Sequence, residues 1–242
     1  AGGEAAGGEE GGGEGRGGRG GPVSAPMIAG FNNLTWDLRV NGATSFPGMI
    51  LWGGNVAGPA AVPGAYQVRL TADGKTLTQP LIIKRHPLQK DITDADLLEQ
   101  FNLAMQIRDK TSEANNAVIQ IRKIKTQVAE RLKANNDAKL KTAGDTLTKN
   151  LSAVEEEIYQ VRNQSGQDPL NFPIKINNRL AALLSMVNHG DGKPIGNALP
   201  VFNDLKAELK AQTDRLARVL STDLAAFNAE AKRLGLEAAS EK

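Results

Sequence analysis

The strongest constraint on this fold is a long segment without helix breakers. The run from Asp94 to Lys133 contains neither proline nor glycine. Its apolar side chains recur every three or four residues, the spacing that places them on one face of an α-helix. At 1.5 Å per residue such a helix is about 60 Å long. Most of the stability of a helix in a protein comes from packing of its apolar face, so we expect other helices to lie along it.

Three later segments show the same apolar spacing. Residues 140–161, 176–187 and 205–234 predict a second, a third and a fourth helix. Short connections favour antiparallel neighbours, so residues 91–242 are expected to form an elongated antiparallel bundle of about four helices. The second and third helices together match the length of the first. The predicted core positions of this bundle are Phe101, Val118, Leu147, Leu220 and Phe227.

Residues 22–90 have the pattern of β-structure instead. Apolar and polar residues alternate from Leu34 to Val40 and again from Tyr66 to Leu70, as in half-buried strands. Asp73-Gly74, between two such runs, predicts a two-residue hairpin turn, because a type I′ turn needs positive φ at both central residues. The alternation predicts that four residues point into the core of this β-region: Trp36, Leu38, Tyr66 and Val68.

Trp52 does not belong to an alternating run. It lies in the segment PGMILWGGNVAGP, where glycines and prolines interrupt any long strand. Two interpretations remain open for it. The side chain covers the end of the β-region as a lid, or it is exposed as a platform that stacks on a carbohydrate ring.

Residues 1–21 have the composition of a linker or long loop. They contain twelve glycines, four Glu and two Arg, and no large apolar residue. Such a segment cannot bury enough surface to offset the entropy lost on ordering. The stretch GRGGRGG resembles RNA-binding RGG repeats. With only two repeats, no nearby aromatic residue and four Glu beside them, RNA binding is the weakest alternative.

The residue types that carry catalysis or bind metals are sparse. The chain has no cysteine and two histidines, His86 and His189, without a metal-binding spacing. No serine-hydrolase or glycosidase constellation is recognisable. The net charge of +2 provides no strong field for nucleic acid or membrane surfaces. No apolar run approaches the ~20 residues of a membrane span. We therefore expect a non-enzymatic chain without a cofactor, a metal or a nucleic-acid partner.

Several segments resemble one family of proteins. The stretch FNNLTWDLRVNGATSFPGMILWGGNVAGPAAVPGAYQVRLTADGKTLTQPLIIKRHP resembles the Ig-like module near the C-terminus of large secreted bacterial sortilin-like proteins. These proteins carry Asp-box, or BNR, β-propellers and are often labelled glycosyl hydrolases. The segments DADLLEQFNLAMQIRDKTSEANNAVIQIRKIK and PLNFPIKINNRLAALLSMVNHGDGKP resemble the helical region that follows. The resemblance covers about residues 31–240.

The resemblance implies an α+β chain: a small Ig-like antiparallel β-sandwich followed by the helical bundle. It further implies that this is the C-terminal region of a longer protein, with the propeller and the first strand or strands of the sandwich upstream. The expected location is secreted, periplasmic or on the outer surface. No catalytic residue of the family can be transferred to this chain.

The expected function is a non-catalytic accessory region that positions or oligomerises the propeller. Its expected partners are that propeller and a second copy of the chain, bound through an uncovered apolar strip on the first and fourth helices. The main alternative is a carbohydrate-binding or hydrolase-associated module, with Trp52 as the platform for a glycan.

Overall fold

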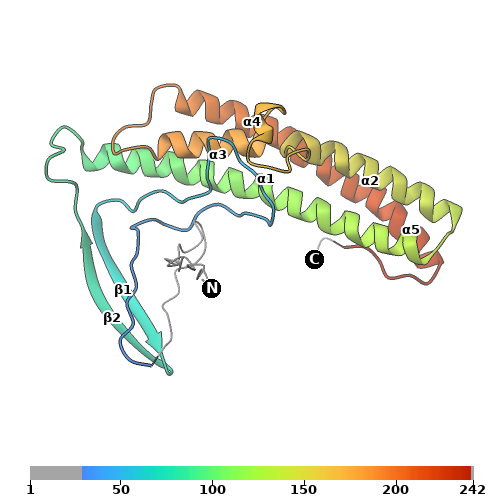
Figure 1. Ribbon diagram of the computed structural model, residues 1–242, viewed down its shortest axis with the longest axis horizontal. Coiled ribbons are helices and arrows are strands. Elements are labelled where there is room, and N and C mark those ends of the chain that lie inside the picture. The colour runs from blue at the N-terminus through green and yellow to red at the C-terminus, as the bar shows by residue number, and fades with distance from the viewer. Residues whose placement is uncertain (1–28, 241–242) are drawn as a thin grey trace, which may run out of the picture.

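The computed structural model describes residues 29–240, and an antiparallel helical bundle forms most of it (Figure 1). The long predicted helix is α1. The last helix is continuous through a π-helical turn, so α4, η2 and α5 form one rod. The helical elements are α1 (Asp94–Ala134), α2 (Ala138–Ile158), the short 3-10 helix η1 (Asp168–Leu170), α3 (Ile176–Val187), α4 (Ala198–Val219), η2 (Leu220–Leu224) and α5 (Ala225–Arg233).

The ends of α1 and α2 are fixed by local capping. Thr93 and Asp96 form a capping box at the start of α1, in which each side chain accepts a hydrogen bond from the other residue's backbone N–H. Asp137 caps α2 by accepting from the N–H groups of Lys139 and Leu140. The chain reverses between Ala134 and Ala138, which makes α2 antiparallel to α1.

The helices pack as the sequence predicts. Both α2 and α3 contact α1, and Figure 1 shows them one after the other along it, so that together they span much of its length. The α4–α5 rod crosses both of them. Val118, Leu147 and Phe227 are completely buried in the resulting core. Leu220, at the π-helical turn, and Phe101, near the start of α1, are half-buried.

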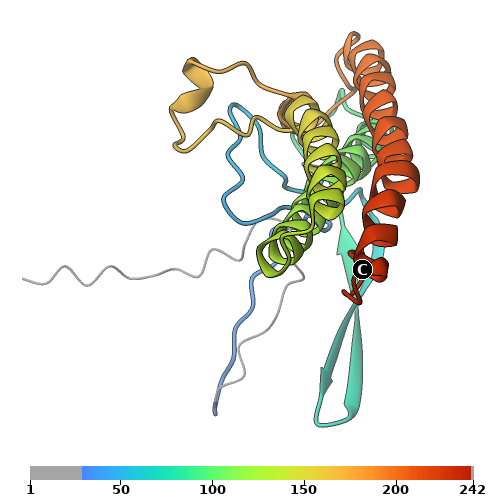
Figure 2. The same cartoon turned by 90° about the vertical axis from the view of Figure 1, so that its right-hand side faces the viewer.

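The β-structure is one antiparallel hairpin, β1 (Gly64–Ala72) and β2 (Lys75–Ile83), which projects from the bundle near the start of α1 (Figure 2). Its turn is the predicted Asp73-Gly74 pair, with φ values of 50° and 73°. These positive angles are those of a type I′ turn, whose twist matches the twist of the flanking strands. The prediction of this hairpin is therefore confirmed.

The predicted strand from Leu34 to Val40 is wrong. Leu38 has a φ of 59°, in the left-handed region, which ends the regular alternation of a strand. Only an isolated bridge between Arg39 and Ala60 forms there. Within residues 29–240 the sheet has two strands, and a facing sheet of the expected sandwich is not found.

This difference changes the burial of the residues expected in the β-core. Leu38 and Val68 are exposed, so their assignment to the core is wrong: the first leaves the strand geometry, and no second sheet covers the other. Trp36 and Tyr66 are half-buried. Each makes a local hydrogen bond, from Trp36 Nε1 to the carbonyl oxygen of Arg39 and from the Tyr66 hydroxyl to that of Val62.

Candidate functional site

The β-region is attached to the bundle by an extended loop, which we call the strap (residues 41–58). The bridge between Arg39 and Ala60 closes this loop, and Figure 1 shows it crossing α1 and α3. Side chains from the helices bind its main chain. Ser112 Oγ accepts from Thr44 N at 3.1 Å, and Asn115 Nδ2 donates to Thr44 O at 2.7 Å. These bonds use the main chain of Thr44 and therefore require no particular side chain there.

One strap residue is bound at both of its backbone groups. Asn178 Oδ1 accepts from Trp52 N at 2.7 Å, and Asn178 Nδ2 donates to Trp52 O at 2.8 Å. Two residues further on, Gly54 lies so close to α3 that an added Cβ would be 2.6 Å from the backbone nitrogen of Ala182. The backbone around Trp52 is thus held by these contacts, while the residue as a whole is 41% exposed. This arrangement presents an indole ring to solvent from a rigid support.

Phe46 anchors the middle of the strap. Its ring is 7% exposed and packs edge-to-face against Tyr159, with ring centroids 5.1 Å apart. The guanidinium of Arg122 lies over both rings, 4.8 Å and 5.1 Å from their centroids. Arg122 Nε and Lys125 Nζ also donate to the buried carboxylate of Glu155, at 2.7 Å and 3.0 Å. The cluster of Arg122, Lys125 and Glu155 between α1 and α2 therefore positions the guanidinium that packs on Phe46.

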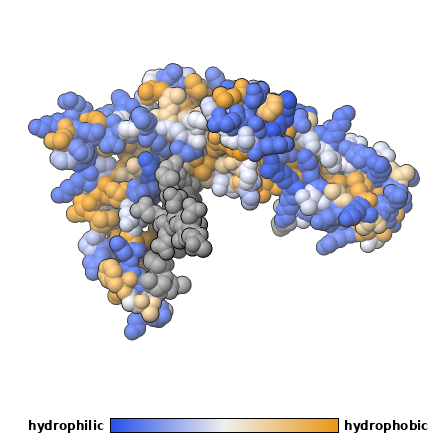
Figure 3. Space-filling model, in the orientation of Figure 1, coloured by the Kyte–Doolittle hydropathy of each residue, from blue (hydrophilic) through white to orange (hydrophobic). Residues whose placement is uncertain are grey.

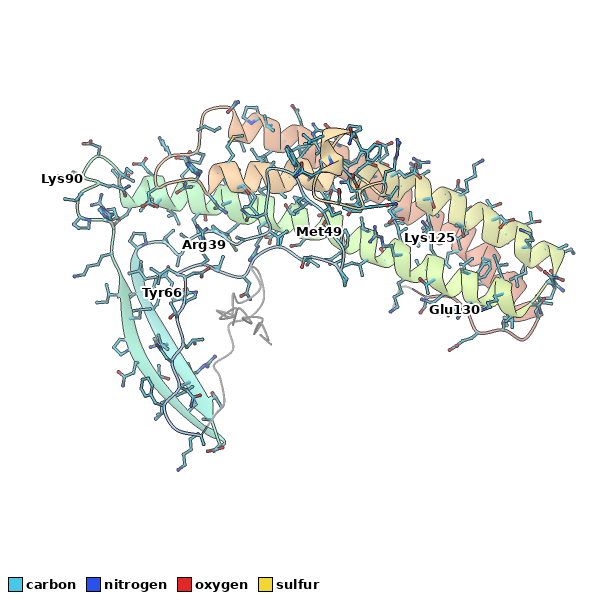
Figure 4. All side chains as sticks on the ribbon, viewed as in Figure 1. Arg39, Met49, Tyr66, Lys90, Lys125 and Glu130 are labelled. Atoms are coloured by element: carbon cyan, nitrogen blue, oxygen red, sulfur yellow. The ribbon has the colours of Figure 1, made fainter. Side chains whose placement is uncertain are left out.

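A ligand-sized cavity lies where the base of the hairpin meets the bundle. Its volume is about 330 Å³, at the lower end of the range for small-molecule sites. Ile83, Leu97 and Phe101 give it an apolar wall, while Arg39 and His86 contribute polar groups. Figure 4 shows Arg39 at this junction of hairpin and bundle. The cavity has the size of a binding site, and its polar groups come from four segments: the one around Arg39, the end of the hairpin, α1 and the loop after α3.

A neighbouring cavity of about 360 Å³ shares Arg39 and is lined by polar residues, including Asp37, Ser185 and His189. The fold thus brings the two histidines to the same end of the molecule but lines different cavities with them. In the described part of the chain, no group of three or more His, Asp or Glu side chains could hold a metal ion. Likewise, none of the described helices is long and apolar enough to cross a membrane.

A shallow, open groove of about 870 Å³ lies between α1 and α4, where the uncovered apolar strip was expected. Ala117, Leu216 and Leu220 contribute its apolar surface, and Asp109 and Lys123 are charged residues of its lining. The groove reaches the π-helical turn η2, an irregularity that often accompanies functional sites. Ala117 and Leu216 are only 6% and 4% exposed and Leu220 is half-buried, so these three residues do not form the uncovered apolar strip that was expected.

The hairpin exposes a cluster of apolar side chains to solvent. Its pairing register places six apolar side chains on one face, which we call the apolar face; the opposite face carries mostly Gln, Arg and Thr. The three residues nearest the tip are highly exposed: Val68 at 52%, Leu70 at 53% and Leu77 at 68%. Orange, hydrophobic residues are visible on the hairpin in Figure 3. The members of the apolar face are Tyr66, Val68, Leu70, Leu77, Leu81 and Ile83.

The perturbed ionisable groups belong to caps and turns. Hydrogen bonds from backbone N–H groups lower the pKa of two aspartates. The bond from Leu140 has the largest effect on the pKa of Asp137, and the bond from Gln164 has the largest effect on that of Asp168. The Thr93 hydroxyl is the main cause of the lowered pKa of Asp96. These carboxylates stabilise chain reversals and helix starts and do not converge on either cavity.

The sequence did not reveal the residues that bind the strap. Asn115, Asn177 and Asn178 are buried polar residues on the inner faces of α1 and α3. Asn177 Nδ2 donates to Asn115 Oδ1 at 3.1 Å, which connects the two helices beneath the strap. The sequence does contain one signal for them, because these asparagines occupy positions that face the core of otherwise apolar helices. The RGG-like stretch, by contrast, lies outside the described residues.

Comparisons of this chain with protein-family models, with curated proteins and with solved structures find no match.

Proposed function

We propose that this chain is a non-catalytic interaction region that positions the β-propeller of a larger, exported sortilin-like protein. The observation that carries this proposal is the exposed apolar face of the hairpin. A two-stranded hairpin is only marginally stable by itself, and it needs further strands or a packing partner. A contiguous exposed apolar face on a projecting element is typical of an interaction site.

The apolar face supports an Ig-like arrangement in which the missing strands come from outside residues 29–240. In a β-sandwich each sheet turns its apolar face towards the other sheet. The hairpin has such a face and a polar reverse side, so it is suited to be half of a sandwich. The exported location of the protein and the identity of the propeller rest on the sequence resemblance.

The bundle supports a positioning role because the strap joins it to the β-region at many points. Main-chain bonds at Thr44, Trp52 and Asn55 are distributed along the strap, and Phe46 anchors it between them. A partner bound to the hairpin would therefore be held in a defined orientation to the bundle. The proposal requires no cofactor.

The test compares two adjacent residues on opposite faces of β2. Leu77→Asp introduces a charge on the apolar face, and Thr76→Asp introduces the same charge on the polar face. Binding of the purified propeller-containing region of the parent protein would be measured by calorimetry. We expect Leu77→Asp to abolish binding and Thr76→Asp to retain it. Absence of binding by the unmodified chain, or equal binding by both variants, would contradict the proposal.

A second candidate function is glycan binding, which the exposed indole of Trp52 favours. The backbone of Trp52 is fixed on both sides by Asn178, so the ring is presented with little freedom of its support. Retention on immobilised polysaccharides should be lost in Trp52→Ala and kept in Phe31→Ala, a second exposed aromatic residue. Equal retention of both variants would exclude a platform at Trp52.

A further inference from the structure

The two edges of the hairpin differ in their ability to accept another strand. In a hairpin with a two-residue type I′ turn, the pair that closes the turn is hydrogen-bonded, and bonded pairs then alternate with non-bonded pairs. Ala72 and Lys75 close this turn, so the pair Gln67 and Pro80 is a non-bonded pair whose backbone groups point outwards. Proline has no N–H and is tolerated there for that reason.

It follows that Pro80 interrupts the outer edge of β2. The edge of β1 has no such interruption. Its outward-facing residues all possess both an N–H and a carbonyl group, and no third strand pairs with them within residues 29–240. An open edge of this kind is a template for the addition of a strand. The outward-facing residues of β1 are Ala65, Gln67, Arg69 and Thr71.

The residue types of β1 are arranged almost symmetrically on either side of its central residue, Val68. If two copies of β1 pair antiparallel around Val68, the two Val68 side chains face each other and Tyr66 lies opposite Leu70 of the second copy. On the reverse side, Gln67 lies opposite Arg69 of the second copy. Apolar residues thus meet apolar residues, a cross-strand combination that stabilises sheets, and no like charges are opposed. All four outward-facing residues of each β1 then pair with their counterparts.

We propose that this chain forms a two-fold dimer through β1, giving a four-stranded sheet in the order β2–β1–β1–β2. The dimer joins the two apolar faces on one side of the sheet, because a two-fold axis perpendicular to a sheet preserves its faces. Pro80 occupies both outer edges of that sheet, which favours a closed dimer over continued strand addition. This inference rests on the proposed interaction function and identifies how the chain would oligomerise a propeller.

The first test uses two cross-strand partners, Arg69 and Thr78, whose backbone N–H groups both point outwards. Arg69→Pro removes a donor from the open edge, and Thr78→Pro removes one from the edge that Pro80 already interrupts. By sedimentation at tens of micromolar, we expect a dimer for the unmodified chain, for Thr78→Pro and for Arg69→Ala, and a monomer for Arg69→Pro. A monomeric unmodified chain, or a dimer that persists in Arg69→Pro, would overturn the proposal.

The second test does not depend on the hairpin tolerating proline. The chain has no cysteine, so one introduced cysteine reports one contact. Val68→Cys places two thiols at the two-fold axis, where Cα atoms of a non-bonded pair are about 4.5 Å apart, within the range that a disulfide spans. Gln79→Cys is the control, because Gln79 is the cross-strand partner of Val68 on the same face.

Mild oxidation should give a covalent dimer with Val68→Cys and little with Gln79→Cys. Equal cross-linking of both variants would show random collision and would overturn the β1 dimer. Binding of the propeller region by a monomeric chain would leave the proposed function intact while refuting this interface, so the two failures are distinguishable.

Discussion

Truncation of Phe46 should detach the strap before the bundle unfolds. Phe→Ala substitutions in buried sites cost about 3–5 kcal/mol of unfolding free energy. Phe46 also loses an edge-to-face contact with Tyr159 and a cation–π contact with Arg122, each of which contributes about 1 kcal/mol. Because Phe46 belongs to the strap and its loss leaves the packing between the helices in place, we expect a total near the lower limit, about 3 kcal/mol.

Two probes separate the strap from the helices in a urea titration. Both tryptophans lie in the β-region, Trp52 in the strap and Trp36 just before it, so their fluorescence follows this segment. Far-UV circular dichroism follows the bundle. In Phe46→Ala the fluorescence transition should occur at lower urea concentration than the dichroism transition, whereas the two should be closer together in the unmodified chain.

Phe31→Ala provides the control, because Phe31 is 91% exposed. Substitution of such a residue should change the unfolding free energy by no more than about 0.5 kcal/mol. Coincident transitions in Phe46→Ala, or a loss below about 1 kcal/mol, would refute the view that this ring anchors the strap.

Three further substitutions, the first with a matched control, test the attachment of the strap and the cap of α2. Gly58→Ala should destabilise the chain, since its Cβ would lie 2.1 Å from a carbonyl oxygen, whereas Gly166→Ala, with no atom within 4 Å, should have little effect in thermal melts. Asn178→Ala should cost about 1–2 kcal/mol in urea unfolding through the loss of two hydrogen bonds to the strap. Hydrogen bonding lowers the pKa of Asp137, so its stabilising contribution is complete above the ordinary Asp value of 3.8 and is lost as pH falls through the lowered pKa. Asp137→Ala should therefore reduce stability at neutral pH and weaken its dependence on pH below 4, and an unchanged acid titration by circular dichroism would contradict this.

The sequence was informative wherever local interactions decide the structure. The absence of proline and glycine between Asp94 and Lys133, with apolar residues at helical spacing, predicted α1 because both signals act within a few residues of the chain. The turn at Asp73-Gly74 was predictable for the same reason, since its φ values depend on those two residues. The capping box at Thr93 is local in the same sense, because it involves only Thr93 and Asp96.

The alternation of apolar and polar residues wrongly predicted a strand for the segment that contains Trp36 and Leu38. Alternation shows that a strand would have one apolar face, but a strand forms only when another strand supplies hydrogen bonds to it. Here a left-handed residue at Leu38 interrupts the segment, and only the bridge from Arg39 to Ala60 pairs with it. Val68 failed as a core residue for a related reason: its face was predicted correctly, but burial requires a partner surface.

The sequence by itself determined the helices, the hairpin turn and the faces that are apolar, because periodicity and turn geometry are local properties. Only the tertiary structure decided that residues 41–58 bind across α1 and α3, that Asn178 holds Trp52, and that the apolar face of the hairpin lacks a cover in the described chain. The contacts of the strap join residues 68 to 130 positions apart through its main-chain groups, which every residue possesses. A sequence pattern cannot specify such contacts, because the donor and acceptor groups of the strap are the same whatever its side chains are.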